Sequence, residues 1–224
     1  MIERYPGAIW LPGPPNKAGG YSRGDRGPKR GEVKHSAVGS WDGMQGVLFG
    51  PRASSWQFSI LKPGTVFQHY DVSVYTWHGN DTDSDGDIEA NFDLVGTEHE
   101  GGPPGNESEP LTPEQVQASI DLSRWLAQTN GFNKWSRYPD QSGWVLAEHN
   151  QVGNSPTACP SGRIPWDVIL AALNETERDL PTTEQAAHAI GFLYPGFWAK
   201  DRSTMHAWDL EIIDRIIRWY KGDL

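Results

Sequence analysis

The chain has 224 residues, a formal net charge of -10 at pH 7 and a single cysteine. This length fits one main domain with an appendage better than two equal domains. The acidic balance argues against nucleic-acid binding, because neutralising phosphates requires clustered Lys and Arg. One cysteine cannot form an internal disulfide, and no signal peptide or membrane-spanning apolar run is recognisable, so we expect a chain synthesised in the cytoplasm.

Residues 1–30 are rich in Pro and Gly and show no helix or strand periodicity, so we expect an ordered wrap or a loose N-terminal arm. The pattern changes at Glu32, where short strands are predicted at 32–37, 55–61 and 65–70. Lys62-Pro63-Gly64 is a turn signal, which makes the second and third of these strands a hairpin.

Further strands are predicted at 74–78, 92–98 and 143–149. A helix is predicted to begin after Thr112, which can cap it, with Pro113 at the first helical position and Gln115 completing a capping box. A short helix is expected at 165–175 and an amphipathic one at 203–220. Alternating strands and helices with a local hairpin predict an α/β fold, a mixed central β-sheet flanked by helices.

We therefore predict three parts: the arm at 1–30, one main domain at 31–179 and a helical C-terminal extension at 180–224. The extension presents an apolar face, which needs a partner. That partner can be the main domain, a second copy of the chain or a bacterial wall.

Three residues have the chemistry of a zinc site. His35 ends the first predicted strand, His149 ends a later one, and Cys159 lies in a loop bounded by two prolines. Zinc prefers imidazole nitrogen and thiolate sulfur, and three protein ligands leave a fourth position open for water. The alternatives are that Cys159 is a small buried apolar residue, or that it is a nucleophile with His149 as its base.

Five segments, in this order, resemble the zinc-dependent N-acetylmuramoyl-L-alanine amidases, a family that includes phage endolysins and peptidoglycan recognition proteins: VKHSA, SSWQFSILKPGTVF, TWHGN, LVGTEHEGG and LAEHNQVGNSPTACPSGRIPW. The resemblance covers about Gly31 to Ile169. It implies that the main domain is a zinc amidase domain and that His35, His149 and Cys159 hold the metal. It also implies peptidoglycan as the substrate and the MurNAc–L-alanine amide as the bond cleaved.

The resemblance points to Glu98 as the acidic residue beside the reacting water, and a carboxylate there can carry both proton transfers of amide hydrolysis. Some phage members have a Tyr and a Lys near the reacting carbonyl, where this chain has Trp56 and Thr157. We expect the Thr157 hydroxyl to be a weak donor there. Trp56 and Trp77 are predicted to hold the substrate at the cleft. The resemblance implies that His78 also lines the cleft, where it is a second candidate donor; the alternative is a core histidine whose ring is satisfied by the backbone.

A second metal is suggested by Asp81, Asp83 and Asp85, which alternate as in a calcium loop. Phe92 stands at the position where an EF-hand carries a bidentate Glu, so an EF-hand is not predicted, and a solvated acidic loop is the alternative.

The predicted function is cell-wall lysis by a phage endolysin that is made in the host cytoplasm and acts on peptidoglycan. A cytosolic wall-recycling amidase and a peptidoglycan-binding module without activity are the alternatives.

Overall fold

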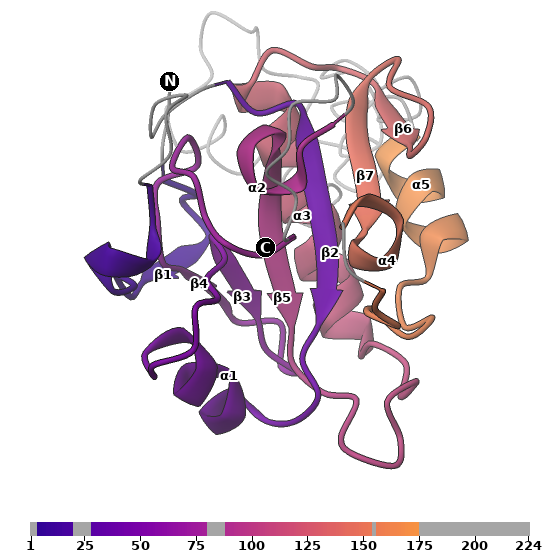
Figure 1. Cartoon of the computed structure of the whole chain (residues 1–224). Coiled ribbons are helices and arrows are strands. Elements are labelled where there is room, and N and C mark those ends of the chain that lie inside the picture. The colour runs from indigo at the N-terminus through magenta and orange to yellow at the C-terminus, as the bar shows by residue number, and fades with distance from the viewer. Residues whose placement is uncertain (1–3, 20–27, 80–87, 154–155, 175–224) are drawn as a thin grey trace, which may run out of the picture. The chain divides into compact units, whose positions relative to one another are not determined.

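The computed structural model describes residues 4–19, 28–79, 88–153 and 156–174. Within these residues a seven-stranded mixed sheet forms the centre of the fold, in the order β1-β4-β3-β5-β2-β7-β6 (Figure 1). The strands are β1 (Ala8–Trp10), β2 (Gly31–Ser36), β3 (Phe58–Ile60), β4 (Val66–Gln68), β5 (Leu94–His99), β6 (Trp135–Arg137) and β7 (Trp144–Glu148).

Parallel pairing dominates the middle of this sheet. Strand β2 lies between β5 and β7 and is parallel to both, and β3 is parallel to β5. The antiparallel pair β3–β4 is the predicted hairpin. Gly64 has a φ of 82° in its turn, a left-handed conformation that favours glycine. The predicted mixed α/β architecture is confirmed.

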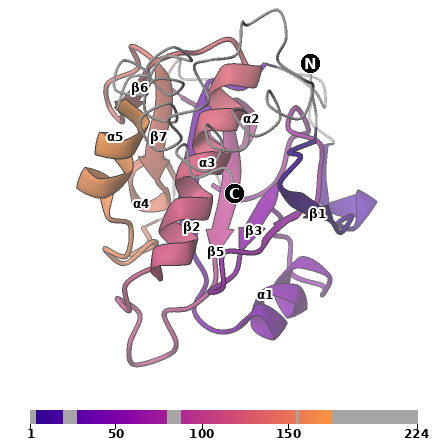
Figure 2. The same ribbon diagram turned by 180° about the vertical axis from the view of Figure 1, so that it is seen from behind.

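Helices lie on both faces of the sheet. They are α1 (Trp41–Leu48), α2 (Ala90–Asp93), α3 (Pro113–Thr129), α4 (His149–Val152) and α5 (Trp166–Asn174), with a 3-10 turn at Pro15–Lys17. Helix α3 crosses the face seen in Figure 2, opposite the face seen in Figure 1. Its predicted capping box is present, because the Thr112 hydroxyl accepts the Gln115 N–H and the Gln115 side chain accepts the Thr112 N–H.

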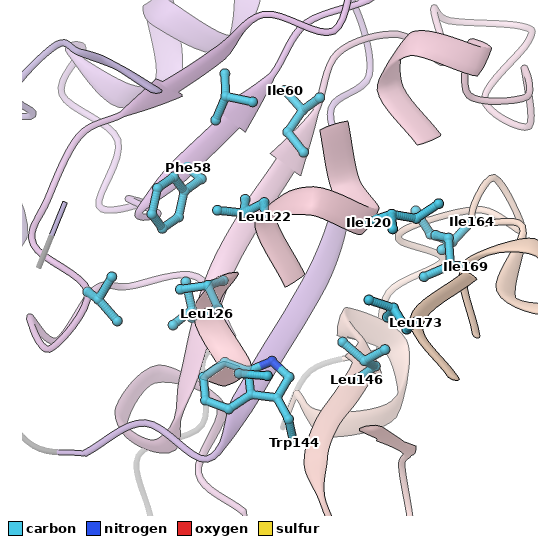
Figure 3. Close-up of a cluster of buried hydrophobic side chains, with 14 of the residues drawn as sticks. Phe58, Ile60, Ile120, Leu122, Leu126, Trp144, Leu146, Ile164, Ile169 and Leu173 are labelled. Carbon is cyan, nitrogen blue, oxygen red and sulfur yellow. The ribbon is translucent and has the colours of Figure 1, made fainter. Parts of the chain in front are cut away.

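The largest apolar cluster lies between the sheet and helices α3 and α5 (Figure 3). Phe58 and Leu146 contribute from the strands, Leu122 and Leu126 from α3, and Ile169 from α5, all with essentially no exposed surface. A smaller cluster on the other face includes Val33, Leu94 and Val152. The sheet is therefore covered on both faces, and its central strands β2 and β5 are buried along almost their whole length.

One predicted strand is corrected, and one strand that was not predicted is added. Residues 74–78 form no strand; Val74 and Thr76 make isolated bridges, and Thr76 pairs with Ala18. Ala8–Trp10, inside the predicted arm, forms the edge strand β1 beside β4 and belongs to the compact unit Met1–Asn174. Periodicity cannot reveal a three-residue strand, because its pairing comes entirely from a distant partner.

Helices α1, α2 and α4 and strand β6 were not predicted. They are short, and α1 contains two glycines that weaken its local helix signal. The predicted helix at 203–220 and the acidic residues Asp81, Asp83 and Asp85 lie outside the described residues. Within the described residues, none of the helices combines the length and apolar character that crossing a lipid bilayer requires.

Candidate active site

Three neighbouring parallel strands deliver polar residues to one edge of the sheet. His35 is the penultimate residue of β2, Glu98 pairs with it in register on β5, and His149 directly follows β7. Residues paired in register on adjacent strands point to the same face. The carboxyl ends of parallel strands are where α/β proteins place their binding sites.

His35, His149 and Cys159 come together at this edge. Their ligand atoms all lie within 4.8 Å of one another, the one such cluster in the described part of the chain. The Cys159 Sγ is 3.8 Å from Nδ1 of His35. Two ligands of a tetrahedral zinc ion, one sulfur and one nitrogen, are separated by about 3.6 Å. Nε2 of His149 is buried and has no hydrogen-bond partner among the described residues. Such an orphaned nitrogen fits a metal ligand.

The protonation states of the two histidines suit metal binding. Burial, together with the neighbouring histidines, holds the pKa of His35 well below its usual value, and burial also lowers the pKa of His149. Both rings are therefore neutral at pH 7 and keep a lone pair for a cation.

Burial raises the pKa of the Cys159 thiol to about 12, with the Glu98 carboxylate as the next contribution. A cysteine nucleophile needs the opposite shift, toward a stable thiolate. The structure therefore disfavours Cys159 as a nucleophile, whereas a divalent cation can deprotonate a coordinating thiol.

The loop that carries Cys159 is tied to both histidine-bearing segments. The Ser36 N–H donates to Sγ of Cys159 over 3.3 Å, and the Asn150 N–H donates to the Cys159 carbonyl. The Thr157 hydroxyl accepts the Cys159 N–H over 3.2 Å. Thr157 therefore supports the cysteine loop, and its own O–H donates to none of the described residues.

Glu98 and Glu100 have different environments. Glu100 accepts the N–H groups of Trp41 and Lys62 and so braces two loops. The Glu98 carboxyl has no hydrogen bond with any described residue, and the side chain is only partly exposed. Burial raises the pKa of Glu98 to about 8, and the Arg163 and Arg52 guanidiniums oppose that rise. Glu98 is therefore the carboxyl free to exchange protons beside the ligand cluster.

A family model described as N-acetylmuramoyl-L-alanine amidase matches residues 25–162, more than half of the chain. The chain belongs to this amidase family. Its matched segment contains His35, Glu98, His149 and Cys159. A search of curated protein sequences finds no significant match.

Solved structures show the same fold as this amidase. A selenomethionine derivative of AmpD has a TM-score of 0.55 at 15% identity, covering 77% of this chain and 99% of that one. The Staphylococcus aureus hydrolase AmiA with its ligand has a TM-score of 0.54 at 14% identity, covering 78% and 84%. A mutant endolysin from Bacillus subtilis has a TM-score of 0.52 at 16% identity, covering 75% and 98%.

The residues predicted to line the cleft of the amidase have unequal access to it. Trp56 is 3% exposed and packs with Met44 and Leu48, so little of its ring is available to a substrate. Trp77 is partly exposed, but its indole N–H is buried without a partner among the described residues. His78 is 7% exposed and lies behind His35, with its Nδ1 3.1 Å from Nε2 of His35. The structure thus places His78 against His35 rather than at an open surface.

An aromatic pair on the same face of the sheet as His35 and Glu98 was not predicted from the sequence. Phe67 pairs in register with Ser59, and Ser59 pairs with Glu98, so one row of side chains crosses the sheet from His35 to Phe67. Two strand spacings place Phe67 about 10 Å from Glu98. Trp41 stacks on Phe67 with ring centroids 4.8 Å apart, and both rings are partly exposed. No local signal marks this pair, because it depends on the strand order.

Arg163 was also missed. Its guanidinium is buried, donates to the Ser36 hydroxyl over 2.6 Å and to the Glu100 carbonyl over 2.9 Å, and forms no ion pair with a described residue. Burial lowers the pKa of Arg163, and the Glu109 and Glu98 carboxylates oppose that effect. Its charge opposes the burial effect on the pKa of both Glu98 and Cys159, so it makes the site more favourable for anions.

Proposed function

We propose that the chain hydrolyses the amide bond between the lactyl group of N-acetylmuramic acid and L-alanine, with a zinc ion held by His35, His149 and Cys159. The observation that carries this proposal is that the ligand atoms of these three residues lie within 4.8 Å of one another, in a chain of the amidase family. Glu98 lies beside them, because it pairs in register with His35. When bound, zinc would supply a Lewis acid that polarises the carbonyl and lowers the pKa of water toward about 7.

Glu98 is the proposed proton carrier. It takes a proton from the attacking water and gives a proton to the alanine nitrogen as the C–N bond breaks. The products are the lactyl carboxylate and a stem peptide with a free amino terminus. A carboxyl pKa raised by burial to about 8 suits this exchange, because a general acid–base group works best near the operating pH.

Two other parts of the site contact the substrate in this proposal. The Thr157 hydroxyl is a weak donor to the developing oxyanion, since its oxygen already accepts the Cys159 N–H and its proton remains free. The exposed faces of Trp41 and Phe67 offer a stacking surface for a sugar ring or a stem peptide, and Trp77 lies on the segment beside His78. The buried Trp56 side chain supports this stacking surface from inside the protein.

The test is mass spectrometry of purified peptidoglycan after digestion with zinc-loaded and chelated protein. Stem peptides with free alanine amino termini should appear only with zinc. Release that survives chelation would support a thiol hydrolase with Cys159 as nucleophile. Sedimentation with the wall and no release in either state would support a binding module without activity.

The proposed biological role is lysis of the bacterial wall by an endolysin, and the alternative is a wall-recycling amidase. The Bacillus subtilis endolysin among the structural neighbours supports the fold required for the first role. Rates on intact sacculi and on soluble muropeptides separate the two. An endolysin should turn over both substrates, whereas a recycling enzyme should act on soluble muropeptides alone.

A further inference from the structure

The two ring nitrogens of His35 face different partners. Nδ1 lies 3.8 Å from Sγ of Cys159, on the side of the ligand cluster, and Nε2 lies 3.1 Å from Nδ1 of His78. The His35 and His78 rings are nearly perpendicular, with an interplanar angle of 89° and centroids 5.1 Å apart. His35 can therefore bind a metal only through Nδ1, and its Nε2 must carry the proton.

His78 determines this proton position through its second nitrogen. Nε2 of His78 is 3.4 Å from the Leu94 carbonyl oxygen, which can only accept a hydrogen bond. Nε2 of a neutral His78 is therefore the protonated nitrogen, and its Nδ1 is left as an acceptor. Nδ1 of His78 can be satisfied only by an N–H on Nε2 of His35. The Leu94 carbonyl therefore fixes the position of the proton on His78, and His78 in turn fixes it on His35.

We propose that His78 is a positioning residue that holds His35 in the tautomer required for zinc, through the chain His35 Nε2–H to His78 Nδ1 and His78 Nε2–H to the Leu94 carbonyl. The inference rests on the proposed function, since it takes His35 as a zinc ligand. Groups that hydrogen-bond the non-ligating nitrogen of a metal-bound histidine fix its tautomer and ring orientation.

The segment around His78 is itself built to hold the ring. The Asn91 side-chain oxygen accepts the N–H of His78 over 2.7 Å and the N–H of Gly79 over 2.6 Å. Strand β5 passes under the ring at Gly96, where an added Cβ would lie 2.8 Å from the His78 ring. Any side chain at Gly96 would clash with the His78 ring, so the glycine is required for the ring to occupy this position.

The burial of both rings makes this arrangement specific. His35 is 2% exposed, so water has little access to replace the hydrogen bond from His78. Without an acceptor at Nδ1 of His78, the His35 N–H would be buried and unpaired. The ring would then favour the other tautomer or a rotated position, and either change removes the lone pair from the ligand cluster.

The test compares two substitutions at this position in the full chain. His78→Leu keeps bulk but removes the acceptor, whereas His78→Asn can place its side-chain oxygen near the former Nδ1. Zinc affinity, measured by competition with a chromophoric chelator, should fall about 10–100-fold in His78→Leu. His78→Asn should recover most of that loss. His69→Asn is the matched control, because this buried histidine contacts Ser59 and the Leu11 carbonyl and no ligand, so its zinc affinity should be unchanged.

Nitrogen-15 NMR of the histidine rings in the metal-free wild type gives a reading that does not depend on a variant folding. His35 and His78 should both be protonated at Nε2. A His35 protonated at Nδ1, or wild-type zinc affinity in a folded His78→Leu, would overturn the proposal. His35→Ala serves to separate the two hypotheses: unchanged zinc affinity in this variant would overturn the ligand set, and with it the proposed function.

Discussion

Replacing Glu98 with Gln should remove activity and at the same time stabilise the metal-free protein at alkaline pH. Gln is nearly isosteric with Glu, and no hydrogen bond from a described residue to the carboxyl is lost. Without a group that can accept and return a proton, kcat should fall about 10²- to 10⁴-fold. Zinc affinity should change little, because Glu98 is not one of the three ligands.

The stability effect follows from the pKa of Glu98, which burial raises from 4.5 to about 8. Below pH 4.5 the carboxyl is protonated in both the folded and the unfolded chain, so it has no effect on the difference. As the pH rises from 4.5 to 8, the unfolded chain ionises while the folded one does not, and wild type loses stability relative to the variant. At 1.36 kcal/mol per pH unit the loss is at most about 5 kcal/mol, and partial exposure of the side chain reduces the expectation to about 1–3 kcal/mol.

Urea unfolding of chelated wild type and Glu98→Gln at pH 4.5 and pH 8.5 measures this difference. Equal stability at pH 4.5 and a more stable variant at pH 8.5 are expected, and zinc should narrow the gap because a nearby cation favours the carboxylate. A variant that is no more stable at pH 8.5, or one that keeps near-wild-type turnover with zinc bound, would refute the reasoning about this carboxyl.

Three further predictions concern a buried ion pair in the sheet, the cap of helix α3 and the stacking surface formed by Trp41 and Phe67. Lys34→Met leaves Glu32, its fully buried partner at 2.7 Å, without a counter-ion. Unfolding experiments should show that the free energy of unfolding falls by about 3–5 kcal/mol. A loss below about 1 kcal/mol would contradict a buried ion pair between the two residues. Thr112→Ala removes the cap of α3 and should lower the free energy of unfolding by about 0.5–2 kcal/mol in the same experiment. Thr112→Ser should restore most of that stability. Equal losses in both variants would contradict a capping role. Trp41→Ala should raise KM for peptidoglycan about 2- to 10-fold with kcat nearly unchanged. Trp10→Ala is the matched control, because Trp10 lies on the opposite face of the sheet from the row that contains Phe67. Equal KM changes in both variants would argue against a stacking role for Trp41.

Some of the predictions made from the sequence are confirmed, and others remain predictions. The resemblance predicted the amidase family, and local patterns predicted the mixed sheet, the hairpin and the capped helix. All four predictions are confirmed. The roles of Glu98 and Thr157 remain predictions, although Glu98 has the freedom and Thr157 the donor that those roles require. The calcium site and the C-terminal helix fall on residues that the structure does not describe.

What the residues alone establish is chemical and local: side chains of the types that bind zinc, the cap of α3, the turn at Gly64 and the apolar core positions. These depend on residue identity and on periods of two or 3.6 residues, which are readable within a short window. The tertiary structure alone decided that β2 lies between β5 and β7. That order brings His35, Glu98 and His149 to one edge, aligns Phe67 with them and places His78 behind His35. Strand order and register join residues that are far apart in the chain, so no local period encodes them.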